Sequence, residues 1–166
     1  MSKALLVTTA DIKKFSVLNG NVDDDKFIQY IGIAQDIYIQ NYLGTKLLEK
    51  IQADIVAGTL AGNYLTLLET YIKPMLIHWA LVEYLPFAAY QVTNKGVYKH
   101  TSETSEVVSK NEVDFLVEKE RQIAQSYTEK FIRYMSFNND KFPEYLSNVN
   151  NDVFPSKESD FNGWVL

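Results

Sequence analysis

The two histidines are the side chains in this sequence best suited to bind a metal or transfer a proton. His78 and His100 stand 22 positions apart, and neither lies in an HxxxH or HExxH arrangement, which would place two ligands on one helix face. His78 is next to Trp79 in an apolar segment. A hydrogen-bonded core histidine explains that setting more simply than a metal ligand does, so we expect His78 to be one.

A partial calcium-loop pattern precedes the first long apolar stretch. Asn19, Asn21 and Asp23 occupy the first three ligand positions of such a loop. The sixth position needs a glycine but holds Asp24, and the twelfth needs a bidentate glutamate but holds Tyr30. Acidic residues here suit the positive end of a helix, so the sequence predicts a helix start instead of a calcium site.

The remaining catalytic patterns are also incomplete. Glu83 lies among apolar residues, but one acid without a partner acid or an electrophile does not make a mechanism. The sequence has no cysteine and no GxxxxGK[ST], GxGxxG or GxSxG motif, which argues against thiolate metal sites, phosphate loops and a nucleophile elbow. We therefore expect no catalytic residue, metal or other cofactor, and a protein that binds other proteins and is not an enzyme.

Composition indicates one folded domain. The 166 residues are 46% apolar and 22% charged, enough for a core that needs no disulfide. The sequence has no signal-peptide pattern and no apolar run near 18 residues, so no membrane segment is expected. A net charge of −5 argues against a dedicated nucleic-acid-binding protein. Acidic residues concentrate in residues 101–120. This pattern is typical of a solvated loop followed by a helix start, and a surface that lines a DNA passage would have the same pattern.

The spacing of apolar residues predicts a mainly α fold. A short helix after Thr8 or Thr9, one from residue 23 to the Gly44 stop and one from residue 45 are expected first. Residues 63–90 are apolar almost all round and contain Pro74 and Pro86, which predicts a kinked central helix. A final helix is expected over residues 111–137, with its core side formed by Leu116, Ile123, Tyr127, Phe131 and Tyr134.

The pattern changes after Tyr90 from helical spacing to strand and turn residues. Residues 91–93 and 97–99 read as short strands around a three-residue turn, with Gly96 in the left-handed position. The sequence therefore predicts a β-hairpin or long loop inserted over about residues 91–110. We expect it to contact a neighbouring protein through Asn94, Lys95, Gly96, Val97 and Tyr98.

The predicted domain organisation is a helical domain over residues 1–137 and an extended, aromatic C-terminal tail over residues 138–166. The tail has no helical period but retains many aromatic residues, which a disordered segment should lack. Burial of its apolar side chains cannot offset the entropy of ordering the whole segment. Two outcomes stay open: the tail becomes ordered on a neighbouring subunit, with Phe154, Phe161 and Trp164 at that interface, or it folds back on its own domain.

The order of these features resembles the head–tail connector (adaptor) family of tailed bacteriophages. The matching segments, which fall between residues 23 and 146, are IAQDIYIQNYLGTKLLEKI (33–51), YIKPMLIHWALVEYLPF (71–87), VTNKGV (92–97) and KFPEYL (141–146). The combination is similar to connectors in phages of Bacteroidetes-type hosts, including crAss-like phages. None of the matching motifs is catalytic.

The resemblance implies a structural protein of the virion, made in the host cytoplasm. It would form a homo-oligomeric ring, dodecameric in this family, between the portal and the neighbouring tail or collar proteins. Genome DNA would pass through the lumen without sequence-specific binding. A helical regulatory or adaptor module that acts as a monomer or dimer is the alternative function.

Overall fold

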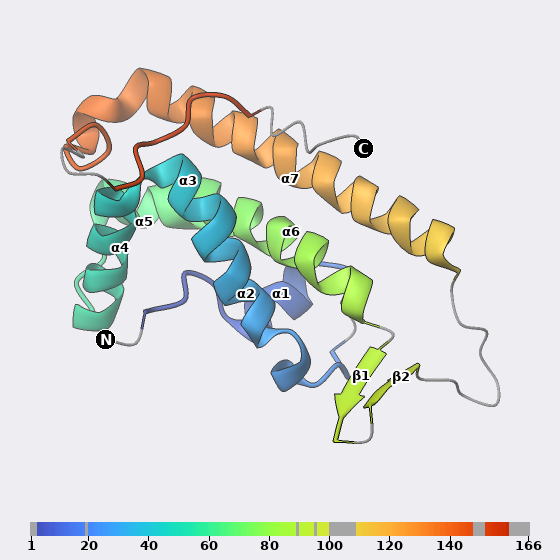
Figure 1. The fold of residues 1–166 in the computed structure, drawn as a ribbon. Coiled ribbons are helices and arrows are strands. Elements are labelled where there is room, and N and C mark those ends of the chain that lie inside the picture. The colour runs from blue at the N-terminus through green and yellow to red at the C-terminus, as the bar shows by residue number, and fades with distance from the viewer. Residues whose placement is uncertain are drawn as a thin grey trace.

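The computed structural model describes residues 3–18, 20–88, 90–94, 96–99, 109–147 and 152–159. The fold is a helical bundle, as the sequence predicts (Figure 1). Helix α6 lies at its centre and packs along α7 on one side and α2 on the other. The chain forms, in order, α1 (Thr9–Phe15), α2 (Ile28–Ala34), α3 (Gln40–Leu43), α4 (Thr45–Ala57), α5 (Gly62–Leu67), α6 (Lys73–Tyr84), β1 (Tyr90–Thr93), β2 (Gly96–Lys99) and α7 (Lys110–Asn138).

The two prolines of the central helical segment coincide with departures from α geometry. A π turn, Leu68–Ile72, joins α5 to α6, and within it the Lys73 N–H donates to the Leu68 carbonyl, five residues back. Pro74, which has no N–H, sits in the first turn of α6 directly after that π turn. Pro86 lies in a 3₁₀ turn, Leu85–Phe87, that ends the segment. The helix therefore changes its hydrogen-bond spacing at each proline without breaking.

Helix α6 is buried on nearly all sides because other helices cover it. Trp79 is fully buried at its middle. The Trp79 ring stacks on Tyr38 at a centroid distance of 3.9 Å, and its Nε1–H donates to the Thr128 hydroxyl at 3.0 Å. These contacts tie α6 to the segment after α2 and to α7. The burial of Trp79 is what the predicted central helix requires.

The buried side of α7 differs from the expected one. Leu116 and Ile123 were expected in the core but are substantially exposed, and Tyr127 and Tyr134 are only partly buried. The residues that α7 buries are Glu120, Ala124, Thr128, Phe131 and Met135. They include polar side chains because α6 presents His78 and Trp79 there, and both make hydrogen bonds to α7.

The segment after α7 belongs to the helical core. A 3₁₀ turn, Asn139–Lys141, follows α7, and Phe142 and Tyr145 beyond it are buried. Phe142 packs edge-on against Tyr64 of α5, whose hydroxyl donates to Glu144 at 2.6 Å. Residues 138–147 therefore pack as part of the bundle. A domain boundary after residue 137 would separate these core residues from the helices that cover them.

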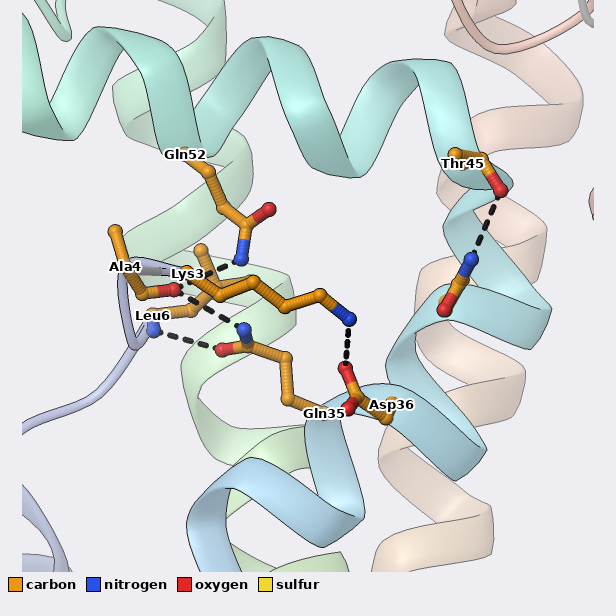
Figure 2. Close-up of polar contacts among 8 residues, drawn as sticks. Lys3, Ala4, Leu6, Gln35, Asp36, Thr45 and Gln52 are labelled. Atoms are coloured by element: carbon orange, nitrogen blue, oxygen red, sulfur yellow. Dashed lines mark hydrogen bonds and ion pairs between the residues drawn. The ribbon is translucent and has the colours of Figure 1, made fainter. Parts of the chain in front are cut away.

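The N-terminal residues cross the bundle as an extended arm held by the side-chain amides of Gln35 and Gln52 (Figure 2). Gln35, buried in the π turn Gln35–Ile39 after α2, accepts from the Leu6 N–H at 2.9 Å and donates to the Ala4 carbonyl at 3.1 Å. Gln52 of α4 donates to the same carbonyl at 2.9 Å. Because one side-chain amide satisfies both a backbone N–H and a C=O, the arm is held much as a paired strand would be.

A capping box at the start of α7 makes its first turn sensitive to acid. The Ser109 N–H donates to Glu112 Oε2 at 2.8 Å, and the Glu112 N–H donates back to the Ser109 hydroxyl. The hydrogen bond from the Ser109 backbone, followed by that from its side chain, lowers the pKa of Glu112. A lowered folded-state pKa supplies stability that is present above the unfolded pKa and is lost as pH falls through the folded value.

We therefore expect amide-exchange protection at Glu112 and Val113 to decline below about pH 4, while protection in the middle of α7 persists. Glu112→Gln should remove this pH dependence, whereas Ser109→Ala should only reduce it, because alanine keeps the backbone N–H that donates to Glu112. Loss of the Ser109 cap should lower the free energy of unfolding by about 1 kcal/mol. Equal protection at pH 7 and pH 3, measured by hydrogen exchange, would contradict this role of the capping box.

Candidate functional site

The predicted hairpin forms, with a shorter turn than expected. Strands β1 and β2 pair antiparallel in the register Tyr90↔Lys99, Gln91↔Tyr98, Val92↔Val97 and Thr93↔Gly96. Since Gly96 pairs with Thr93, only residues 94 and 95 lie between the strands. The prediction of a three-residue turn was therefore wrong. Gly96 has a φ of 124°, as expected of a position that favours glycine.

Several of the candidate interface residues are on this hairpin. Asn94 and Gly96 are exposed, and the Val97 side chain is 67% exposed. Tyr98 is in β2, opposite Gln91. Lys95 lies outside the described residues. A two-stranded hairpin has no second layer that could cover the Val97 side chain, so this apolar side chain is available for contact with another protein.

An aromatic cluster that the sequence analysis did not identify lies at the base of the hairpin. Phe87 stacks on Tyr30 at a centroid distance of 5.7 Å, and Tyr30 also contacts Tyr84 at 5.5 Å. Phe87 and Tyr90 each keep about half of their surface exposed, at 56% and 50%. Pro86 is the residue in the sequence that could have indicated the exposure of Phe87 and Tyr90. A proline favours the end of a helix, so aromatic residues that follow it can leave the core.

The first turns of α7 bring further apolar side chains to the same end of the bundle. Phe115 is 62% exposed and Leu116 is also exposed. Helix α7 contacts the 3₁₀ turn that contains Phe87, and Figure 1 shows the start of α7 at the end of the molecule that carries the hairpin. We call the exposed apolar side chains at this end the hairpin-end surface; its members are Phe87, Tyr90, Val97, Phe115 and Leu116.

Helix α7 finishes at the opposite end of the bundle from the hairpin (Figure 1). Apolar side chains are exposed there as well. Phe137, in the last turn of α7, is 82% exposed, and Leu146 and Phe154 are exposed as well. We call these three residues the tail-end surface. The 29 residues of α7 span about 43 Å at 1.5 Å per residue, so this helix holds the two surfaces apart at opposite ends of the molecule.

A cavity of about 250 Å³ lies between α1, α6 and α7. Its charged lining residues and His78 make ion pairs or hydrogen bonds within the fold. Lys73 Nζ lies 2.8 Å from Glu69 Oε1 and 3.6 Å from Asp11 Oδ2, and His78 Nδ1 lies 2.7 Å from Glu120 Oε2. The His78 ring also stacks on Tyr127. His78 is thus hydrogen-bonded, as expected, but it is partly buried at the cavity and does not lie in the core. These contacts join α6 to its neighbouring helices.

Two tyrosine–carboxylate hydrogen bonds join the helices elsewhere. Tyr38 donates to Glu83 at 2.6 Å, and burial together with this bond raises the pKa of the Tyr38 phenol. Burial and the bond to Glu144 raise the pKa of Tyr64 to about 12. A raised phenol pKa keeps each tyrosine a neutral hydrogen-bond donor at physiological pH. Glu83, considered above as a lone acid, therefore accepts a hydrogen bond from Tyr38.

Comparison with known proteins identifies a family whose function is unknown. Residues 39–155 match the Family of unknown function (DUF6712). The chain belongs to that family. No curated protein and no solved structure matches it. The matched region runs from the end of the π turn before α3 to residue 155, so it contains the hairpin, α7 and both apolar ends.

The structure divides the predicted interface residues between two places. Asn94, Gly96, Val97 and Tyr98 lie in the hairpin and Phe154 lies at the opposite end, so these residues do not form one site. Phe161 and Trp164 lie outside the described residues. Within the described ranges, no group of three or more His, Asp or Glu side chains is arranged to hold a metal ion. No helix in that part of the chain is long and apolar enough to cross a membrane.

Proposed function

We propose that this protein is a structural connector that joins the portal to the tail of a tailed bacteriophage. The observation that carries the proposal is the pair of apolar surfaces held apart by α7, the hairpin-end surface and the tail-end surface. A connector needs one binding surface for the protein above it and another for the protein below it. Clusters of exposed aromatic and aliphatic side chains are typical of such protein–protein contacts.

In this function, copies of the chain stand side by side in a ring, a dodecamer by analogy with the family that the sequence resembles. Each copy contributes its hairpin end to one face of the ring and its tail end to the other. The net charge of −5 suits a ring around DNA, because an acidic lumen does not retain the phosphate backbone and the genome can slide through. Such a protein belongs to the head–tail junction of the virion.

Charged substitutions at the hairpin end test the proposal directly. Val97→Lys and Phe115→Lys place a charge on side chains that are 67% and 62% exposed, so each should change the free energy of unfolding by less than about 0.5 kcal/mol. Each should nevertheless weaken binding to the portal protein by tenfold or more, because truncating or charging a central apolar contact costs at least about 1.4 kcal/mol. Binding is measured by co-purification with the portal and by sedimentation.

Val56→Lys is the matched control, because Val56 is 74% exposed on α4, outside both surfaces. It should leave portal binding unchanged. Equal binding by the control and the hairpin-end variants would contradict the assignment of the hairpin end.

The alternative function, a helical regulatory module, is separated from a connector by mass. In the presence of the portal, a connector assembles into a closed ring that electron microscopy resolves, whereas a regulatory module remains a monomer or dimer. Genes for a portal, capsid or terminase next to the gene of this protein are also expected. A stable monomer or dimer that does not bind the portal protein encoded by the neighbouring gene would refute the connector function.

A further inference from the structure

The residues just after the bundle fold back across the break between α3 and α4. We call residues 152–156 the C-terminal strap. The Thr45 N–H donates to the Val153 carbonyl at 3.1 Å, and the Ser156 N–H donates to the Asn41 carbonyl at 2.9 Å. The strap thus satisfies one backbone acceptor at the end of α3 and one backbone donor at the start of α4, both of which a helix terminus leaves open.

Gly44 provides the space for this contact. Its backbone has φ 76° and ψ 156°, a conformation open almost only to glycine. A β-carbon at this position would lie 2.8 Å from Pro155 Cδ and 3.2 Å from the Val153 carbonyl oxygen. Pro155 is buried here, whereas Phe154 beside it is 51% exposed. The break at Gly44 is therefore a socket shaped for a short extended segment with proline at its centre.

A side-chain contact adds to the backbone pairing. The Asp152 carboxylate lies beside the Thr45 hydroxyl, whose interaction with it lowers the pKa of Asp152. The Thr45 hydroxyl also accepts a hydrogen bond from Gln40 at 2.9 Å. Gly44 occupies the cap position of α4, which leaves the Thr45 hydroxyl free of a capping role and places it between α3, α4 and the strap. The socket thus recognises the strap by its backbone, by one acidic side chain and by one proline ring.

We propose that the socket at Gly44 receives the C-terminal strap of a second copy of this chain, so that neighbouring copies exchange straps. The backbone bonds that the structure shows join Asn41 and Thr45 to Val153 and Ser156, so the same bonds can form within one chain or between two copies. This inference rests on the proposed function in one respect, the close lateral packing of copies. The exposed Phe154 would then lie at the boundary between two copies.

The reach of the connecting chain sets a condition on the exchange. Five peptide bonds join Ser147 to Asp152, and they extend over at most about 17 Å. Ser147 itself is held beside the socket of its own chain, since Lys46 Nζ donates to the Ser147 carbonyl at 3.0 Å. A strap can enter the socket of a neighbouring copy only if that socket lies within this reach of the Ser147 that precedes the strap. Adjacent copies must therefore meet near the α3–α4 break.

The absence of cysteine makes the exchange measurable in the full-length chain. Asn41→Cys places a thiol at the socket and Ser156→Cys places one on the strap, next to each other in the docked state. The double variant, treated at low concentration with a short thiol-specific cross-linker, confirms that the two positions can be joined. The two single variants are then mixed in equal amounts and treated with the same reagent at rising protein concentration.

Exchange predicts a covalent dimer that contains one copy of each variant. Its yield at roughly millimolar protein should exceed the control at least about fivefold, because a short linker gives the chain's own strap an effective concentration in the same range. The control mixes Ser156→Cys with Val56→Cys, whose thiol is exposed at the far end of α4. A dimer yield equal to that of the control overturns the proposal.

The test separates this inference from the connector function. If rings assemble on the portal but no mixed covalent dimers form, the connector function stands and the strap exchange is overturned. If mixed dimers form but the chain does not bind a portal, the strap exchange stands and the connector function is overturned.

Discussion

Trp79→Ala is expected to lower the free energy of unfolding by about 3–5 kcal/mol, the usual range for removing a large aromatic side chain from a core. Trp79 is fully buried, stacks on Tyr38 and donates to Thr128, so its loss leaves a cavity and removes a buried hydrogen bond where α6 meets α7. For a domain of this size the melting temperature should fall by about 6–20 °C, measurable by calorimetry or circular dichroism.

Thr128→Val is the companion variant. It retains the shape of the Thr128 side chain but leaves the buried Trp79 N–H without its acceptor, at an expected cost of about 1–3 kcal/mol. The two losses should be less than additive in the double variant, because both remove the same bond. An unchanged melting temperature for Trp79→Ala would contradict the central position of α6.

Gly44→Ala is expected to lower the free energy of unfolding by about 2–4 kcal/mol. Forcing a β-carbon into this backbone conformation costs roughly 1–3 kcal/mol. The new methyl group also displaces Pro155, and each ring methylene that loses its burial costs about 0.8 kcal/mol. Chemical denaturation gives the total, and hydrogen exchange at Thr45 and Ser156 reports whether the strap has left the socket.

Gly58→Ala supplies the matched control. Gly58 ends α4 as Gly44 precedes it, has a φ of 67°, and has open space where a β-carbon would lie. Its replacement should cost only the left-handed backbone term, about 1–2 kcal/mol, and leave the strap protected. Adding Pro155→Ala should relieve part of the penalty of Gly44→Ala and none of that of Gly58→Ala. Equal penalties at the two glycines would show that the strap does not press on Gly44.

The local elements of the fold could be predicted because local rules govern them. Thr8 caps α1 through a capping box with Asp11, Gly44 ends the helical run that begins after Asp23, and Gly96 takes a positive φ in the hairpin. Each of these depends on residues within a few positions along the chain. Trp79 was also placed correctly, because a helix that is apolar all round has only one stable location, the core.

The candidate site was predicted only in part, for a related reason. Strand and turn residues identified the hairpin, but its aromatic base was missed, because Tyr30 and Phe87 are 57 positions apart and meet only in the folded chain. The core side of α7 was misplaced by the choice of the largest apolar residues. Leu116 and Ile123 are exposed because no helix in the described part of the chain covers them, while Glu120 is buried where His78 provides a hydrogen-bond partner.

The sequence by itself determined the class of this protein: a mainly α chain with a buried central helix, an inserted hairpin and glycines at its turns. The tertiary structure alone decided which apolar residues stay exposed and what lies against Gly44. The sequence explains that glycine as a helix stop, but Pro155, 111 positions later, is what fills the space beside it. Helix periods and turns follow from interactions a few residues long, whereas burial depends on which distant segment packs on top.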